Sequence, residues 1–418
     1  MTDLAWIDTT LAAARPRALG ALLRYFRNLD TAEEAFQEAC LRALRSWPDK
    51  GPPRDPVAWL ILVGRNSGID AVRRGARLEA LPDEDLISDT GDAESDMADR
   101  LDGSHYRDDI LRLMFICCHP DLPATQQIAL ALRIVSGLSV QQIARAFLVG
   151  DSAMEQRITR AKARVARAGV AFETPGVAER AERLSRVTTM IYLVFNEGYS
   201  QSDPKRDACA FADEAIRLAR LLLGIFPSEP EIMGLLALML LQLSRRAARF
   251  DAEGQIVLLE DQDRSRWNRE AINEALALIE KAIRHRQPGP YQIQAAIAAL
   301  HARAIRAEDT DWTQIELLYR TLEHVQPSPV VTLNRAVAVA KRSGPAEALE
   351  MVEQLVGALD GYFYFHGLRG NLLMQLGRNH EARTAFGRAI ALAQSPAEAA
   401  HIRLQLDRLK ADAETSLG

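Results

Sequence analysis

The sequence predicts an all-α protein made of several domains. Alanine, leucine, arginine and glutamate recur throughout the chain and runs of β-branched residues are rare, a composition that favours helices over sheets. Hydrophobic residues make up 48% of the 418 residues and charged residues 26%, which is a normal globular balance. Because this length exceeds one ordinary core, we expect two to four domains.

Charge is distributed unevenly along the chain, although the net charge is only −5. Residues 1–78 carry 12 Lys and Arg against 9 Asp and Glu, and residues 110–169 carry 8 against 3. Residues 79–109, between them, carry 2 against 12. Local charge reports on partners better than the total does, so two basic blocks separated by an acidic one need an explanation.

Cysteine use and hydropathy argue against the secreted and membrane classes. The four cysteines form no C-x-x-C pair, and the adjacent Cys117 and Cys118 cannot readily bridge each other, which favours a reducing compartment. The N-terminus lacks a basic-then-apolar signal, and the longest apolar run, near residues 234–243, is about half a membrane span. We therefore expect a soluble, cytoplasmic protein with no membrane segment.

The first 78 residues are predicted to form three helices. Asp30 is expected to cap the second helix, with further acids in its first turn. The apolar face of that helix is expected at Phe36, Cys40, Leu41 and Leu44. After a Pro/Gly loop, the third helix runs from about Val57 to Arg77. Residues 79–109 are acidic and aperiodic, which predicts a flexible linker, and helices resume at about Asp109.

The third helix is predicted to have one apolar face and one face with mixed chemistry. The second face carries Trp59, Leu62, Asn66, Asp70, Arg73 and Arg77. An aromatic ring, an amide and arginines suit melted DNA, because rings and arginines stack on unpaired bases and an amide can recognise a flipped base edge. Trp59 also fits a packed core position, whereas an amide at Asn66 has little reason to be buried.

Residues 139–167 have the pattern of a helix-turn-helix, whose second helix enters the major groove of DNA. Ser139 is a good N-cap for the first helix, and residues 148–152 form the turn. On the second helix an inward stripe is expected at Met154, Ile158 and Val165. A separate basic face contains Arg157, Arg160, Arg164 and Arg167. An ordinary amphipathic helix with a solvated basic side is the alternative, but the preceding helix and turn favour DNA binding.

The last part of the chain shows a 34-residue period. Ala336, Ala348, Val352 and Leu355 align with Gly370, Ala382, Phe386 and Ala389. A small residue followed by alanine and larger apolar residues is the tetratricopeptide layout, in which small residues let paired helices approach. A third copy would contain Gly234, Ala275, Ile279 and Ala282, if residues 247–267 are an insertion.

Three segments together resemble the extracytoplasmic-function sigma factors of bacterial RNA polymerase, over about residues 10–170. D-T-A-E-E-A-F-Q-E-A at Asp30–Ala39 is similar to the family's helix that binds core polymerase. W-L-x-x-V-x-R-N-x-x-x-D-x-x-R-R at Trp59–Arg74 is similar to its −10 element helix. G-L-S-V-Q-Q-I-A to R-I-T-R-A-K, at Gly137–Lys162, is similar to its −35 helix-turn-helix.

The resemblance implies a role for each matched residue. Asn66 would lie in the pocket for a flipped −10 base, with Asp70 beside it, while Arg73, Arg74 and Arg77 would hold the template-proximal DNA backbone. The residues facing the −35 element would be Glu155, Gln156, Arg157, Thr159, Arg160 and Arg164, the early ones reaching base edges and the later arginines phosphates. The residues on or near the polymerase surface would be Asp30, Glu33, Glu34, Phe36 and Glu38.

The resemblance also implies a domain organisation and partners. Residues 1–78 would be sigma region 2, residues 79–109 an acidic linker, residues 110–170 sigma region 4, and residues 171–418 a tetratricopeptide-like domain. The linker would mimic nucleic acid in the polymerase's RNA path or act as a plain spacer. The partners would be core polymerase, through its β′ clamp and β flap, promoter DNA, and a protein bound by the repeats.

The C-terminal half is similar to the subgroup with such an extension, at residues 117–120, 195–199 and 258–267. Departures are Gly150, where a proline is common, and the degenerate early repeats. Residues 196–199 are expected to end a helix with a glycine C-cap.

Enzyme chemistry, cofactors and metals are not expected. Cys117-Cys118-His119 supplies too few ligands at the wrong spacing for zinc, and the charged run at residues 260–267 fits a salt-bridged loop better than a catalytic site. No phosphate loop, dinucleotide fingerprint or nucleophile elbow occurs. Two alternatives stay open: a DNA-binding regulator that never binds core polymerase, and a repeat-based adaptor.

Overall fold

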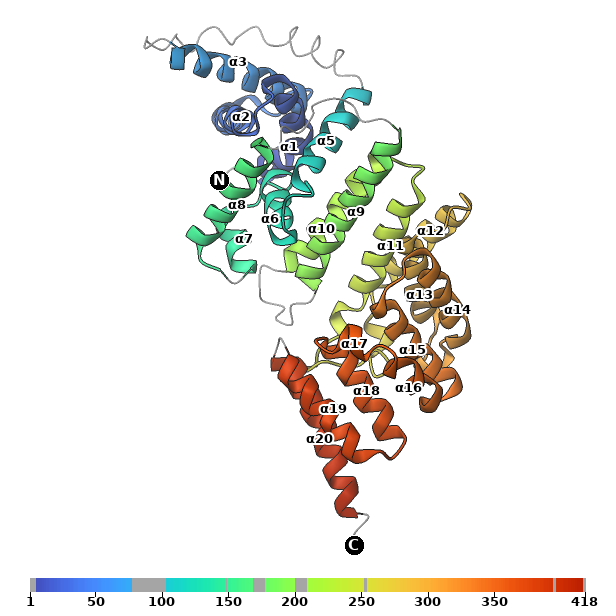
Figure 1. The fold of residues 1–418 in the computed structure, drawn as a ribbon. Coiled ribbons are helices and arrows are strands. Elements are labelled where there is room, and N and C mark those ends of the chain that lie inside the picture. Colours follow the sequence, from blue (N-terminus) through green and yellow to red (C-terminus); the bar gives the residue numbers. More distant parts are fainter. Residues whose placement is uncertain are drawn as a thin grey trace. The chain divides into compact units, whose positions relative to one another are not determined.

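The computed structural model describes residues 5–76, 103–147, 149–167, 177–199, 209–251, 254–393 and 396–415. Within these ranges the regular structure is helical, and the sole β pairing is an isolated bridge between Phe250 and Ile256 (Figure 1). The prediction of an all-α fold is therefore confirmed. No helix in the described ranges is long and apolar enough to cross a membrane.

The chain divides into two compact units. The first is Met1–Gly198 with Arg206–Glu214, and the second is Tyr199–Lys205 with Ala215–Gly418. From the N-terminus to Tyr199 the helices are α1 Ala5–Phe26, α2 Leu29–Lys50, α3 Pro56–Ala76, α5 Gly103–Cys117, α6 Ala124–Ile134, α7 Val140–Ala146, α8 Asp151–Arg167 and α9 Val177–Tyr199. The first unit thus extends beyond residue 170, where the sequence predicts a domain boundary.

Helices α1, α2 and α3 form a three-helix bundle, and α5 packs against α1. The inward face of α2 is made mainly of alanines, namely Ala32, Ala35, Ala39 and Ala43, with Phe36 and Trp47. Small side chains on this face allow the three helices to approach closely. The predicted apolar face is therefore partly wrong, because Leu41 and Leu44 are 52% and 45% exposed.

Three further sequence expectations about helix ends differ from the structure. Asn28 caps α2 in place of Asp30, since its side-chain oxygen accepts a hydrogen bond from the Thr31 backbone N–H at 3.0 Å. Helix α5 begins at Gly103, so the last residues of the predicted linker are helical, and residues 77–102 are not described. Gly198 lies inside α9 and is not a C-cap.

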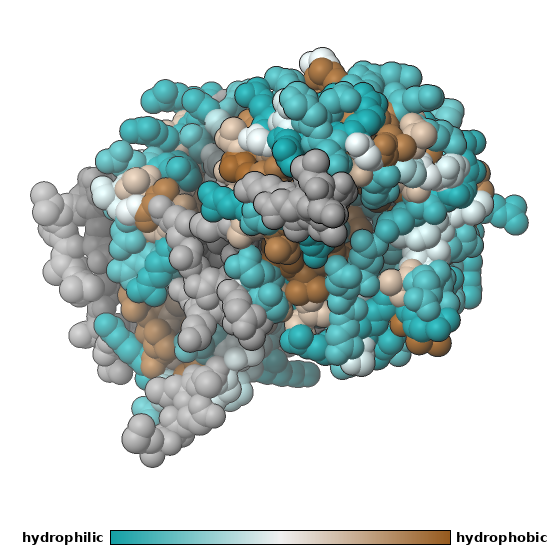
Figure 2. All heavy atoms as spheres, turned by 90° about the horizontal axis from the view of Figure 1, so that it is seen from below, coloured by the Kyte–Doolittle hydropathy of each residue, from teal (hydrophilic) through white to brown (hydrophobic). Residues whose placement is uncertain are grey.

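The second unit is a series of helices in which neighbours along the chain pack against each other, except that α16 packs against α18 and the short α17 against α15. Its helices are α11 Pro230–Ser244, α12 Arg269–Ile283, α13 Pro290–Arg303, α14 Trp312–Val325, α15 Pro329–Ser343, α16 Pro345–Glu353, α17 Val356–Leu359, α18 Phe363–Gln375, α19 Asn379–Leu392 and α20 Pro396–Thr415. Helix α10, Cys209–Ile225, has its first residues in the first unit and the rest, from Ala215 on, in the second. Figure 2 shows one face of the molecule, which is mainly hydrophilic with smaller hydrophobic patches.

The 34-residue period corresponds to two helical hairpins, α15 with α16 and α18 with α19. Ala336, Ala348 and Val352 of the first hairpin are fully buried, as are Ala382 and Phe386 of the second. A Cβ atom on Gly370 of α18 would lie 2.5 Å from the Phe386 ring of α19, so this glycine is needed for the close approach of the pair.

Gly234, in the proposed third copy, is placed differently from Gly370. A Cβ atom there would lie 2.5 Å from the backbone nitrogen of Gln292 on α13, and not against the following helix α12. Ala275, Ile279 and Ala282 of α12 are nevertheless buried. Gly234 therefore allows α11 to approach α13, whereas Gly370 allows α18 to approach the helix that follows it. The proposed third copy does not repeat the contact seen in the later hairpin.

Substituting Gly370→Ala tests the close contact between α18 and α19. Because the new methyl group would overlap the Phe386 ring, we expect the free energy of unfolding to fall by about 1–3 kcal/mol in urea denaturation followed by circular dichroism. The matched control is Gly387→Ala in α19, which meets no atom within 4 Å. That substitution is expected to stabilise the protein by about 0.5–1 kcal/mol, and equal effects at both sites would contradict the account.

Candidate nucleic-acid and polymerase interface

The helix-turn-helix begins with a complete capping box at α7. The Ser139 side-chain oxygen accepts a hydrogen bond from the Gln142 backbone N–H at 3.1 Å, and the Gln142 side-chain oxygen accepts one from the Ser139 N–H at 2.8 Å. This pair satisfies two N–H groups that the first turn otherwise leaves unbonded. The predicted N-cap at Ser139 is confirmed.

Helix α8 has the two faces that its sequence predicts. Its buried residues are Met154, Ile158, Ala161 and Val165, which confirms the inward stripe. The exposed side chains include Glu155, Gln156, Thr159, Arg160 and Arg164. Since one face is held in the core, the polar and basic face is fixed in orientation and available for contact.

Several side chains on the exposed face of α8 have local partners that orient them. The Arg157 guanidinium is half-buried and lies 5.8 Å from the centre of the Phe147 ring. Arg160 donates a hydrogen bond to the Gln156 side-chain oxygen at 3.3 Å, and Arg164 donates one to the Asp121 carbonyl at 3.0 Å. A hollow of about 510 Å³ adjoins this face and is lined by Asp121, Gln126, Arg160, Ala163, Arg164 and Arg167.

On α3 the structure separates two residues that the sequence places on one face. Trp59 is 9% exposed, and its ring meets that of Trp47 edge-on at 5.4 Å between centres. Trp59 is therefore a core residue, and its prediction as a DNA contact is wrong for this structure. Asn66 is exposed, as predicted. The side chains of Asp70, Arg73 and Arg74 lie outside the described part of the structure, as does Arg77 entirely.

An aromatic residue that the sequence analysis did not select lies at the surface beside α3. Tyr25, on α1, is 45% exposed, and the Arg65 guanidinium lies 4.4 Å from the centre of its ring. Arg65 directly precedes Asn66 in the chain. No sequence spacing relates Tyr25 to Arg65, because they come from different helices.

The residues predicted to face polymerase occupy two different environments on α2. Asp30 and Glu34 are exposed, and Glu38 is half-buried with an ion pair to Arg42 at 3.3 Å. Glu33 is 4% exposed and Phe36 is 2% exposed. Glu33 and Phe36 are therefore not on the exposed face of α2 but beneath it, because both side chains point into the first unit.

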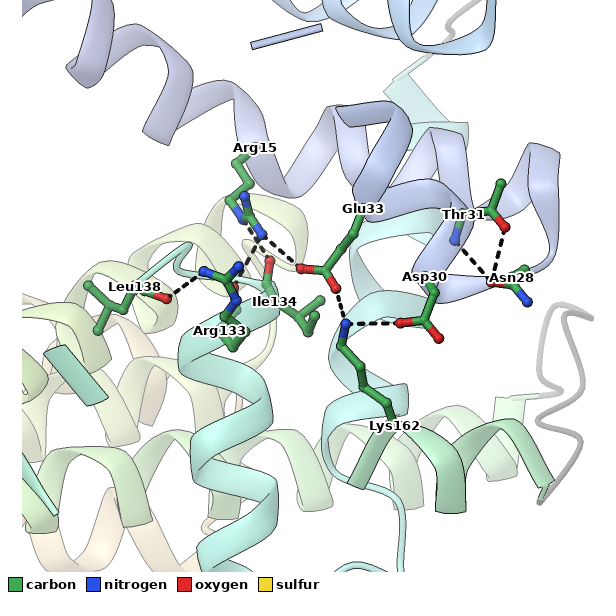
Figure 3. Close-up of polar contacts among 9 residues, drawn as sticks. All are labelled: Arg15, Asn28, Asp30, Thr31, Glu33, Arg133, Ile134, Leu138 and Lys162. Atoms are coloured by element: carbon green, nitrogen blue, oxygen red, sulfur yellow. Dashed lines mark hydrogen bonds and ion pairs between the residues drawn. The ribbon is translucent and has the colours of Figure 1, made fainter. Parts of the chain in front are cut away.

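Glu33 is buried within a cluster of charges that joins four helices (Figure 3). Arg15 of α1 pairs with its Oε1 atom at 3.5 Å, and Lys162 of α8 pairs with its Oε2 atom. Lys162 also contacts Asp30 at 3.0 Å. Arg15 donates further hydrogen bonds to the carbonyls of Ile134 at 3.0 Å and Arg133 at 3.2 Å, at the end of α6.

The charge state of Lys162 fits this environment. Burial alone would lower its pKa, but hydrogen bonds and attraction from Glu33 and then Asp30 outweigh burial, so the pKa is raised. The ammonium group therefore stays charged at neutral pH. Removing one partner of a buried charge lowers the free energy of unfolding by far more than the intact pair adds to it. This cluster therefore constrains how α1, α2, α6 and α8 pack.

The cysteines singled out in the sequence are packing residues. Cys117 and Cys118 at the end of α5 are buried, and burial raises the pKa of Cys118 to about 12 and that of Cys117 well above its ordinary value. Both thiols are therefore protonated and unreactive at neutral pH. Among the described residues, no group of three or more His, Cys, Asp or Glu is placed to hold a metal ion.

The contrast between Trp59 and Asn66 yields a prediction. Trp59→Ala should lower the free energy of unfolding by about 3–5 kcal/mol, because it removes a buried ring from the contact with Trp47. Asn66→Ala should change it by less than about 0.5 kcal/mol, because the amide is exposed. Urea denaturation of both full-length variants measures the two effects, and a similar loss for both would contradict the placement of Asn66 at the surface.

Comparison with known proteins identifies both candidate regions. Residues 11–78 match the family model for sigma-70 region 2, and residues 112–165 match that for sigma-70 region 4. Residues 183–283 match a family of unknown function, DUF6596. A protein of Rhizobium meliloti (strain 1021), named Uncharacterized protein R00370, is 71% identical over 416 residues, which is 99% of this chain and 98% of that protein. The chain belongs to the family of that Rhizobium protein, and its regions 2 and 4 indicate a sigma factor of the extracytoplasmic-function type.

Proposed function

We propose that this protein binds core RNA polymerase, directs it to promoters with matching −10 and −35 elements, and helps to melt the start site. The observation that carries the proposal is the fixed, exposed face of α8 in a helix-turn-helix that matches sigma region 4. The same chain also matches sigma region 2, which would supply the contacts to the −10 element.

For the −35 element, we assign base contacts to the start of the exposed α8 face and phosphate contacts to its later part. Glu155, Gln156 and Thr159 are exposed in the first turns, from which side chains reach base edges in the major groove. Arg157, Arg160 and Arg164 are suited to phosphates, since arginine forms strong charge-assisted hydrogen bonds. The hollow lined by Arg160 and Arg164 would receive the DNA backbone.

For the −10 element, the exposed Asn66 amide is proposed to bind a flipped base. Tyr25, with Arg65 stacked on it, replaces Trp59 as the ring that an unpaired base would meet, because Trp59 is inside the bundle. Asp70 is proposed to lie beside the base pocket. Backbone contacts by Arg73, Arg74 and Arg77 rest on the family resemblance.

For core polymerase, we propose a contact face on α2 formed by its exposed residues. Leu41 and Leu44 are large apolar side chains at the surface, and Glu34 is exposed about two and three turns before them. An apolar centre with a charged rim is the usual anatomy of a protein interface. The β′ clamp is the proposed partner of this face, and the β flap that of region 4.

The second unit is proposed to regulate the sigma activity by binding a protein, because stacked helical hairpins build extended surfaces for such partners. A regulator that never contacts polymerase is the second candidate function, favoured only by the helix-turn-helix itself. A measurement of binding to core polymerase distinguishes the sigma factor from this regulator.

The double variant Leu41→Glu with Leu44→Glu tests the polymerase face. Desolvating two charges at an apolar contact is expected to weaken binding to purified core at least about tenfold, measured by fluorescence anisotropy of labelled full-length protein. Leu404→Glu, at a 52% exposed leucine of the second unit, is the control and should bind as the parent protein does. If the double variant binds core as tightly as the parent protein does, the exposed face of α2 is not part of the interface.

Arg160→Ala tests the −35 assignment. Removing one phosphate contact should weaken binding of the core-bound protein to promoter DNA and reduce the slope of log affinity against log salt by about 0.9. Arg303→Ala, at an exposed arginine of the second unit, should leave the slope unchanged. An unaltered slope for Arg160→Ala would show that this side chain does not contact the backbone.

A further inference from the structure

Three arginines of the second unit have only neutral hydrogen-bond partners among the described residues. We name them the arginine triad: Arg245 at the end of α11, Arg249 after the short helix Arg246–Ala248, and Arg264 at the start of the short helix Arg264–Arg266. Arg245 donates a hydrogen bond to the Tyr199 hydroxyl at 3.3 Å, and Arg249 donates one to the Tyr199 carbonyl at 2.5 Å. No carboxylate in the described part of the chain forms an ion pair with either of them.

Arg264 is the buried member of the triad, with 7% of its surface exposed. It donates hydrogen bonds to the carbonyls of His301 at 2.6 Å and Ala304 at 2.7 Å, at the end of α13. Its Nε atom is buried without a hydrogen-bond partner among the described residues. Asp309 attracts this guanidinium, but the Asp309 carboxylate is paired with Arg306. The positive charge of Arg264 is therefore held by neutral oxygens and is not cancelled by an ion pair.

Arg245 lies close enough to the other two arginines to repel both. Burial lowers the pKa of Arg264, and repulsion from Arg245 lowers it further. Burial also lowers the pKa of Arg249; Tyr199 opposes this change and Arg245 adds to it. Burial, then Arg245 and then Arg264 lower the pKa of His301 to about 4, so its imidazole is neutral at neutral pH. Positive charge is thus concentrated around Arg245, and an anionic group placed there would relieve the repulsion.

The guanidinium group of Arg249 is held by aromatic rings. It lies 3.9 Å from the centre of the Tyr199 ring and 5.2 Å from the centre of the Phe250 ring. An arginine stacks on a ring through its flat face, which leaves N–H groups at its edge to bind a carboxylate in a bidentate manner. Arg245 and Arg249 are both half-buried, so a group approaching from solvent can reach them.

Exposed aromatic side chains adjoin Arg249. Tyr364, at the start of α18, is 56% exposed, and it is close enough to Arg249 for each to affect the other's pKa. The centre of its ring lies 5.4 Å from that of Tyr362 and 5.0 Å from that of Phe363. Tyrosine and arginine are among the residues most enriched in the parts of protein interfaces that carry the binding energy. A contact with another protein therefore fits this surface better than a site for a small ion.

We propose that the arginine triad and Tyr364 form a docking site for an acidic segment of a partner protein. Arg245 and Arg249 each bind a carboxylate of that segment, Tyr364 covers the contact, and the buried Arg264 adds positive charge behind it. This inference rests on the proposed regulatory role of the second unit and specifies the chemistry of its partner. It involves neither polymerase nor DNA, so its failure is distinguishable from failure of the sigma function.

A fluorescein-labelled short peptide of alternating Asp and Glu residues tests the site by fluorescence anisotropy with the full-length protein alone. Arg245→Gln with Arg249→Gln should weaken binding at least about tenfold, because two charge-assisted contacts are lost. The matched control is Lys281→Gln with Arg284→Gln, which removes two exposed charges at the end of α12 and should change the affinity less than about twofold. Circular dichroism verifies that both variants fold. Equal losses in the two variants would reduce the effect to net charge and overturn the site.

Photo-cross-linking tests the site in the unaltered protein. A photo-reactive group on the same peptide should mark residues 245–250 or 362–364, as mapped by mass spectrometry. Marks confined to the basic segments of the first unit would overturn the proposal, as would equally tight binding of a peptide of alternating Asn and Gln. Tighter binding of inorganic pyrophosphate than of the acidic peptide would also overturn it, by assigning the triad to a small phosphate ligand.

Discussion

The first unit depends on how it accommodates one buried carboxylate. An ionised group removed from water is tolerated only when it is paired and hydrogen-bonded. Glu33 obtains two cationic partners from helices on either side of α2, one of which is Arg15 and the other Lys162. Because Arg15 also bonds carbonyls at the end of α6, this charge cluster, together with the packing of α5 on α1 and α6, constrains how the bundle α1–α3 and the helix-turn-helix lie against each other.

Asp30 extends this cluster to the surface, since its side chain is exposed yet bonded to Lys162. On the face of α8 that points away from the cluster, Arg160 and Arg164 are exposed, so positive charge remains at the surface there.

Periodicity predicted the helices well and their buried faces less well. The stripe at Met154, Ile158 and Val165 was predictable because large apolar residues alternate there with charges. On α2 the buried face is made mainly of alanines. The larger Leu41 and Leu44 were predicted to be on that face, but both are exposed. Small residues bury well where helices approach closely, and single-helix patterns do not show which neighbour approaches.

Other features depend on tertiary contacts that no local pattern contains. Trp59 and Asn66 are seven residues apart and share a face, but the aromatic cluster with Trp47 covers only the first of them. Glu33 and Lys162 are 129 residues apart, and Tyr25 and Arg65 come from different helices. In the second unit, the 34-residue period did predict paired helices, because Gly370 and Phe386 carry their packing relation in their spacing.

The most direct measurement of the central claim is run-off transcription by purified core polymerase, with and without the full-length protein, from a library of promoters that vary in their −10 and −35 elements. The account predicts transcripts that require the protein and that share a sequence preference in both elements. Stable core binding with no protein-dependent transcript from any member of the library would contradict it.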